Sequence, residues 1–165
     1  VFGLPSMTAS RLEGKVSLSQ TEIRNYEVRK GDVFFTRTSE TPEEVGMSSV
    51  MLDDSENTVF SGFVLRARPR DSRLADEFKA YCFRSSEVRR QIVAGASYTT
   101  RALTNGRLLS RVIISLPSLP EQTAIAEVLS EMDAEIAALE RRREKTLALK
   151  QGMMQELLTG RTRLV

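Results

Sequence analysis

Few residues of this chain could take part in catalysis. Asp71, Glu77 and Lys79 follow the acid, acid-x-lysine order of metal-dependent nucleases, but so short a pattern arises by chance in many chains. The sequence has no histidine, the side chain that most often serves as a general base or metal ligand. Its one cysteine, Cys82, has no second thiol for a disulfide or a zinc site, and we interpret it as a buried core residue. We expect no catalytic residues and no metal site, with a metal-dependent nuclease as the weakest alternative.

Motifs for cofactor binding are also missing from the sequence. A methyltransferase would need a glycine-rich cofactor loop and an Asn/Asp-Pro-Pro-aromatic motif. A nucleotide-driven translocase would need a G-x-x-x-x-G-K-(S/T) loop. None of these occurs in the sequence, so we expect the chain itself to bind no cofactor.

The side chains that could contact DNA are more numerous. Residues 79–111 contain seven basic residues and a single acid, Glu87, a local excess that would attract phosphates. Base readout needs hydrogen-bonding side chains held by a rigid frame, and phosphate contacts need basic and hydroxyl groups. Three polar segments qualify as candidates, with a solvated surface as the alternative for each. The candidate DNA-binding residues are Arg37, Thr38 and Ser39 in the first segment, Arg84, Ser86, Arg89 and Arg90 in the second, and Tyr98, Thr99, Thr100, Arg101 and Asn105 in the third.

The elements that must position these residues indicate an α+β fold. Residues 32–36, 58–60, 63–68 and 108–116 have the β-branched and aromatic character of strands. Residues 74–84 and 85–94 read as helices, the second capped by Ser85 or Ser86 and ended by Gly95. Residues 37–49 and 96–106 read as polar loops. We expect a small mixed α/β domain over residues 1–119, incomplete at its N-terminal side.

The character of the sequence changes at Pro120. Residues 120–159 predict one long helix, with Pro120 in its first turn, Gly160 as its C-terminal cap, and a tail at 160–165. Apolar residues recur there in alternating steps of four and three, which is the spacing of a coiled-coil seam. Because an uncovered apolar stripe is marginal in water, we expect this helix to pair with another helix. The predicted seam consists of Ile125, Leu129, Met132, Ile136, Leu139, Met153 and Leu157.

Length and composition fit one domain with an appended element. The chain has 165 residues, 41% hydrophobic and 28% charged, and its net charge of +2 does not by itself indicate nucleic-acid binding. No apolar run approaches the ~20 residues of a membrane helix. The N-terminus has no signal-peptide pattern. We therefore expect a cytoplasmic protein with no membrane partner.

Several motifs resemble type I restriction-modification specificity subunits. Residues 116–129, LPSLPEQTAIAEVL, are similar to the junction that opens a conserved helix in that family, and the helix ends in a family-like Leu-Leu-Thr-Gly at 157–160. Upstream, GDVFFTRT at 31–38 resembles a strand of the same family. The resemblance covers residues 27–160, with specific motifs on the helix and a variable middle.

The resemblance implies a non-catalytic, sequence-specific DNA-binding protein in a bacterial defence system. A whole specificity subunit usually has two target-recognition domains and two helices that form an antiparallel coiled coil, and each domain reads half of a bipartite site in double-stranded DNA. Methylation subunits, which bind S-adenosylmethionine, dock on it, and restriction subunits join them.

This chain departs from the family pattern in having one domain and one helix. It is therefore either a fragment or a half-size subunit that pairs with a second copy of itself. The alternative to DNA readout is a coiled-coil adaptor protein.

Overall fold

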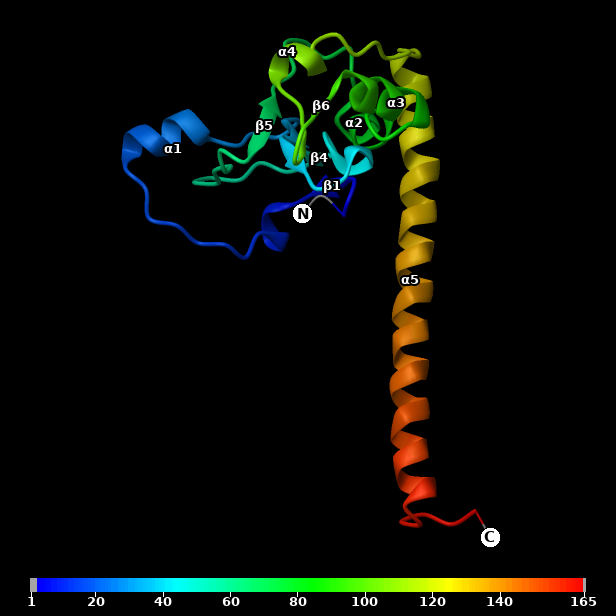
Figure 1. The fold of residues 1–165 in the computed structure, drawn as a ribbon. Helices are drawn as coiled ribbons and strands as arrows, with labels where there is room; N and C mark the ends of the chain where they lie inside the picture. Colours follow the sequence, from blue (N-terminus) through cyan, green and yellow to red (C-terminus); the bar gives the residue numbers. More distant parts are fainter. Residues whose placement is uncertain (1–2, 165) are drawn as a thin grey trace. The chain divides into compact units, whose positions relative to one another are not determined.

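The computed structural model describes residues 3–164 and divides into two compact units, residues 1–126 and 127–165 (Figure 1). Helices and strands mix along the first unit, so the predicted α+β class is confirmed. The elements in chain order are β1 (Ser6–Met7), the 3-10 helix η1 (Ala9–Arg11), α1 (Gln20–Tyr26), β2 (Val33–Thr36), β3 (Thr38–Ser39), the 3-10 helix η2 (Pro42–Glu44), β4 (Ser48–Met51), β5 (Val64–Ala67), α2 (Asp76–Cys82), α3 (Ser86–Gly95), β6 (Ser97–Tyr98), β7 (Ala102–Leu103), α4 (Gly106–Leu109) and α5 (Leu119–Leu158).

A four-stranded sheet with the order β1-β4-β2-β5 forms the centre of the first unit. β1 pairs with β4 in parallel, and β2 pairs antiparallel with both β4 and β5. Alternate residues of β2 point to opposite faces. Val33 and Phe35 pack in a cluster with Ala80 of α2, whereas Phe34 packs on the other face with Met7 and Met51. The central strand is therefore buried on both sides.

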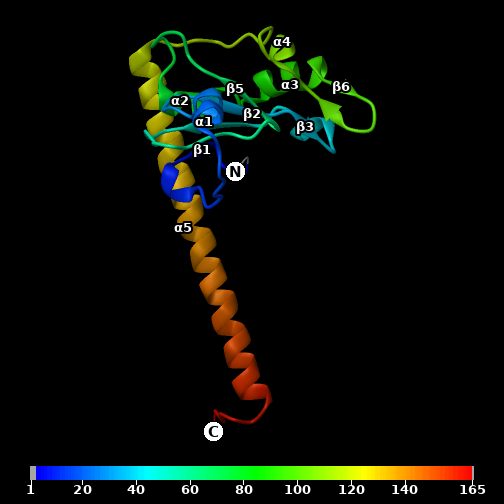
Figure 2. The ribbon, with the colours of Figure 1, turned by 90° about the vertical axis from the view of Figure 1, so that its left-hand side faces the viewer.

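A second sheet, with the order β3-β7-β6, follows directly from the first. Only Arg37 separates β2 from β3 along the chain. Figure 2 shows β3 continuing past the end of β2, with the hairpin that carries β6 beside it. α3 supports this sheet, because Val88 and Ile92 form a core cluster with Val45 and with Ala102 of β7.

The Gly-Asp pair that precedes β2 is held by ion pairs and hydrogen bonds. Gly31 has a φ of +81°, which favours glycine, and its carbonyl accepts a hydrogen bond from the buried Lys79. The fully buried Asp32 accepts two hydrogen bonds from Arg68, each at 2.7 Å, and one from the backbone N–H of Arg29. These contacts fix the start of the strand that leads to the second sheet.

The structure corrects four of the predicted elements. Residues 58–60 contribute only an isolated bridge between Val59 and Glu27, and no strand occurs at 108–116, where α4 is followed by irregular backbone. The segments 37–49 and 96–106 are not simple loops, since they contain β3, β4, β6 and β7. The strands at 32–36 and 63–68 are confirmed by β2 and β5, and the two helices by α2 and α3. Ser85 caps α3 by accepting a hydrogen bond from the N–H of Val88.

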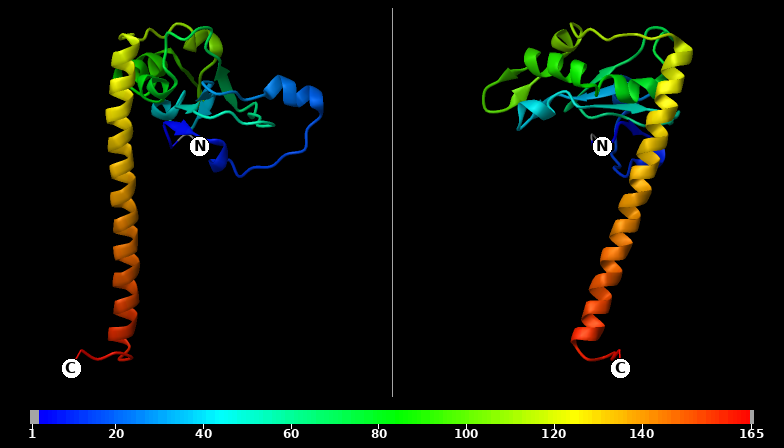
Figure 3. Two further views of the ribbon diagram at one scale, coloured as in Figure 1. Left: turned by 180° about the vertical axis from the view of Figure 1, so that it is seen from behind. Right: turned by 90° about the vertical axis from the view of Figure 1, so that its right-hand side faces the viewer.

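The long helix is confirmed as α5, 40 residues without a break (Figure 3). Gly160 has a φ of +71° and donates its N–H to the carbonyl of Leu157, which confirms it as the cap. The first two turns of α5 belong to the first unit. Gln122 and Ala126 are buried there, and Ile125, a predicted seam residue, packs against the cluster of Phe78, Cys82 and Ala126. Ile125 is only partly buried by this contact, so its place in a helix–helix interface stays a prediction.

Candidate nucleic-acid interface

The three-stranded sheet joins two of the candidate DNA-binding segments. Thr38 and Ser39 form β3 and pair with Leu103 and Ala102 of β7. β7 pairs in turn with β6, which contains Tyr98. Segments separated by about sixty residues in the sequence therefore lie side by side, and the turn 99–101 connects β6 to the central strand β7.

The surface of this sheet is exposed and rich in hydrogen-bonding groups. The Tyr98 side chain is 58% exposed, and Ser97, Thr99 and Thr100 are exposed beside it. Arg101 lies 3.7 Å from Glu40, and both side chains are exposed, so this ion pair is open to solvent and weak. Ser39 donates its hydroxyl to Glu44 at 3.2 Å. A polyanion could compete for Arg101 at little cost.

One arginine of the second candidate segment, Arg89, is used inside the protein. Arg89 donates hydrogen bonds to the carbonyls of Glu43, Val45 and Gly46 at 2.7, 2.7 and 2.8 Å. Burial lowers the pKa of the Arg89 guanidinium, and the nearby charge of Arg84 lowers it further. These contacts anchor the η2 loop to α3, so we leave Arg89 out of the interface that we propose.

Two other arginines of this segment, and Asn105 of the third segment, also have local partners. Arg84 donates to the carbonyl of Ser48 at 3.3 Å, and the exposed Arg90 donates to the carbonyl of Ser86 in its own helix. Asn105 caps α4 by accepting the N–H of Leu108 at 3.1 Å. DNA contact by these residues stays a prediction.

The basic excess of residues 79–111 is smaller at the surface than in the sequence. Lys79 is 2% exposed and forms an ion pair with Asp76, and Arg89 is occupied by three carbonyls. The side chains of two of the seven basic residues are thus engaged by contacts within the protein. The surface formed by the remaining residues of 79–111 is polar but less basic than the sequence suggested. Recognition of DNA by this surface would therefore depend on hydrogen bonds as well as on charge.

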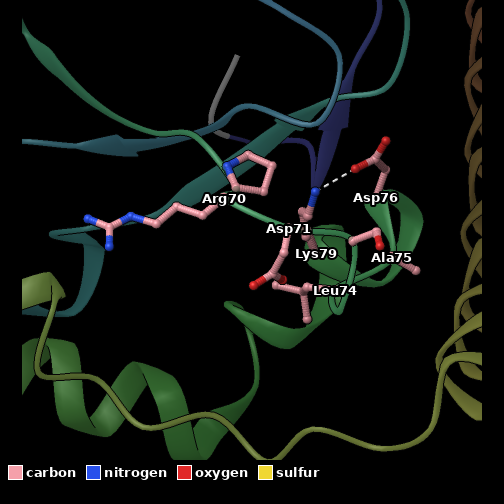
Figure 4. A pocket seen from close by; sticks show the side chains of 8 residues that line it. Arg70, Asp71, Leu74, Ala75, Asp76 and Lys79 are labelled. Atoms are coloured by element: carbon pink, nitrogen blue, oxygen red, sulfur yellow. Dashed lines mark hydrogen bonds and ion pairs between the residues drawn. The ribbon is translucent and has the colours of Figure 1, made fainter.

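The residues of the nuclease-like pattern do not come together as a metal site. Figure 4 shows the amino group of Lys79 directed at Asp76, while Arg70 extends away from them. Asp71 instead forms hydrogen bonds with Arg73 of the same turn. Within residues 3–164, no group of three or more acidic or cysteine side chains could hold a metal ion. The pattern therefore gives no support to a nuclease.

Sequence reasoning assigned no role to two residues that the structure makes prominent. Phe63, expected within a strand, lies in the turn before β5 and is 83% exposed. Gln122 is fully buried at the start of α5 and joins three backbone groups of the first unit. Its place beside Glu121 in the family-like motif was the available signal for a structural role.

The chain matches the sequence family described as "Type I restriction modification DNA specificity domain" over residues 3–149, most of its length. It belongs to this family. The family is non-catalytic, in agreement with our expectation that the chain carries no active site of its own. The match also extends from the domain into α5, so the helix is part of the family's own architecture.

A curated relative has a name that agrees with this family. The putative type I restriction enzyme MjaX specificity subunit of Methanocaldococcus jannaschii is 26% identical over 145 residues. The aligned region covers 86% of this chain and 33% of that protein, so the chain spans a third of the relative's length.

Among the helices of residues 3–164, none has the length and apolar character to cross a membrane.

Proposed function

We propose that this DNA specificity domain reads one half of a bipartite site in double-stranded DNA. The observation that carries the proposal is the β3-β7-β6 sheet, which brings residues 37–39 and 97–101 to one exposed surface. The major groove of B-DNA, about 12 Å wide, admits a two-stranded β-ribbon. The β6–β7 hairpin is a ribbon of this kind, with hydroxyl groups, an aromatic ring and a guanidinium around its turn.

The fold provides the rigid frame that base readout requires. Ala102 of β7 is fully buried against Val88 and Ile92, so the ribbon is attached to the core through its inner strand. Side chains on rigid elements hold their positions better than side chains on free loops. The hydroxyl groups of Thr99 and Thr100 suit base edges or phosphates, and the tyrosine suits apolar contact with a base.

We further propose that α5 pairs with another helix and presents surfaces to methylation subunits, which a restriction subunit would join. S-adenosylmethionine would be bound by the methylation subunits. In this helix, Met132, Ile136 and Leu139 are each 54–56% exposed to solvent. Together with the half-exposed Leu129, they retain the heptad spacing over residues 127–139. Met153 and Leu157 continue the stripe near the end of the helix.

DNA binding is tested by fluorescence anisotropy of the full chain, together with methylation subunits where they co-purify, at several salt concentrations. If contacts to phosphates drive binding, log Kd should rise linearly with the logarithm of the salt concentration. Arg101→Ala should weaken binding about ten-fold or more if the guanidinium reads a base. Arg24→Ala removes the same charge from the exposed face of α1 and should change affinity little. Binding that neither depends on salt nor distinguishes these variants would favour the adaptor alternative.

Helix pairing is tested by light scattering of the purified chain at several concentrations. The wild type should be a dimer, and Ile136→Asp, which places a charge in the seam, should give a monomer. Ala134→Asp puts the same charge on the opposite side of the helix and should remain dimeric. A monomeric wild type would contradict self-pairing and favour pairing within a longer chain. If α5 also sets the distance between half-sites, an inserted heptad should change their spacing.

A further inference from the structure

Phe63 is unusual among the phenylalanines of residues 3–164. Phe34, Phe35 and Phe78 are buried, and Phe60 and Phe83 pack against the core clusters. Phe63 alone among them is a largely exposed ring, at 83%. An isolated exposed apolar residue needs no explanation by itself, so the case depends on how its backbone is held and on what lies beside it.

The backbone of Phe63 is held on both sides. Its N–H donates to the hydroxyl of Ser61 at 3.2 Å, and its carbonyl accepts the N–H of Arg37 at 3.4 Å. The next residue, Val64, donates its N–H to the carbonyl of Ser61 at 3.1 Å, which closes a turn. The aromatic ring is thus carried by a fixed turn, and little backbone entropy remains to be lost when it binds.

Arg37 is the cross-strand neighbour of Phe63. β2 and β5 pair Phe35 with Leu65 and Thr36 with Val64, and the Arg37–Phe63 hydrogen bond continues that register by one pair. Opposed residues in an antiparallel pair have Cβ atoms about 4.5–5.5 Å apart. An exposed guanidinium and an exposed ring are therefore presented together, just beyond the end of the core sheet.

The same arginine links this pair to the proposed DNA-reading sheet. The carbonyl of Arg37 accepts the N–H of Thr104 at 3.0 Å, which continues the register of β3 with β7. The backbone of Arg37 therefore joins Phe63 on one side and Thr104, the residue directly after β7, on the other. Any DNA that lies along the β3-β7-β6 sheet lies next to this pair.

We infer that Phe63 and Arg37 act as a specificity-determining pair that contacts a thymine and an adjacent guanine in the major groove. The inference rests on the proposed function. A phenyl ring makes apolar contact with the thymine C5-methyl group, and an arginine binds O6 and N7 of guanine through two hydrogen bonds. Duplex DNA is the ligand that fits this pair of side chains. Its major groove can place a thymine methyl group beside the O6 and N7 acceptors of a guanine, and its phosphates attract the arginine.

The test begins with selection of binding sites from random duplexes by the wild-type chain, with methylation subunits where they co-purify. Each thymine of the selected half-site is then replaced in turn by uracil, which removes only the methyl group. At one thymine, wild-type affinity should fall about four-fold, the contribution of burying one methyl-sized group. Phe63→Ala should bind the thymine and uracil duplexes equally at that position, and Phe63→Leu should recover part of the difference.

Ile113→Ala is the matched control, because Ile113 is also exposed, at 76%, and lies outside the sheet. Its uracil profile should match that of the wild type. If the wild type selects no motif, the proposed function fails and the inference fails with it. If a motif is selected but no uracil substitution matters, or if Phe63→Ala stays sensitive at the same thymine, the inference alone is wrong.

Discussion

Replacing Gln122 should destabilise the DNA specificity domain, although the residue lies at the start of α5. Its side-chain oxygen accepts the N–H of Ala75 at 2.8 Å, and its nitrogen donates to the carbonyls of Arg73 and Pro117, both at 2.9 Å. The side chain is fully buried, so water cannot replace these partners in Gln122→Ala.

The loss can be estimated from the three hydrogen bonds. Each contributes about 1 kcal/mol net, and a buried group left unpaired costs at least that much. We expect Gln122→Ala to lower the free energy of unfolding by about 3 kcal/mol, and Tm by about 10 °C for a unit of this size.

Thermal and urea unfolding should be followed by near-ultraviolet circular dichroism. The three tyrosines and seven phenylalanines all precede residue 99, so this signal reports the domain and excludes most of α5. Gln151→Ala, at an exposed position of α5, should change Tm by less than about 2 °C, as expected of surface substitutions. Gln122→Met keeps the volume and removes the hydrogen bonds. If it were as stable as the wild type, packing rather than hydrogen bonding would explain the burial, and our reasoning would be refuted.

Four further expectations concern Gly31, Cys82 and Arg89. Gly31→Ala should cost about 2 kcal/mol, because Gly31 has a φ of +81° and an added Cβ would lie 2.7 Å from a side-chain oxygen of Asp76; an unchanged urea midpoint would count against this. Burial raises the pKa of the Cys82 thiol to about 12, so the native protein should resist alkylation at pH 8 and react once unfolded. The same shift should make stability fall as pH rises from about 9 towards 12, since the unfolded thiol ionises first. Arg89→Ala should lower the free energy of unfolding by about 3 kcal/mol through three lost hydrogen bonds, whereas the exposed Arg90→Ala should change it by less than about 0.5 kcal/mol.

The elements with strong local signals could be predicted from the sequence. The aromatic and β-branched run at 32–36 forms β2, Ser85 caps α3, and the long seam-bearing segment forms α5. β4 escaped prediction because Ser48 and Ser49 resemble loop residues, yet both are about 1% exposed. They are buried because β4 lies between β1 and β2, a pairing that no local pattern reveals.

The expected strand at 108–116 failed for a related reason. Its apolar residues suit a strand, but the side chain of Gln91 binds both the N–H and the carbonyl of Ile113, so these backbone groups need no partner strand.

The candidate interface could be predicted only in part from the sequence. A count of charges along the sequence could not distinguish the exposed Arg101 from the buried Lys79. The pairing of β3 with β7 depends on residues more than sixty positions apart.

The position of Arg37 has a consequence for how such domains could diversify. Because the backbone of Arg37 is hydrogen-bonded to both Phe63 and Thr104, it fixes the base of the β3-β7-β6 sheet beside the core sheet, whereas the turn at 99–101 is exposed. Turn residues can be exchanged, or the turn lengthened, without disturbing the packing of Ala102 or the β2–β5 ladder. If the domain reads DNA as proposed, a lineage could change its target by replacing a few residues at the tip while the fold of the domain stays unaltered.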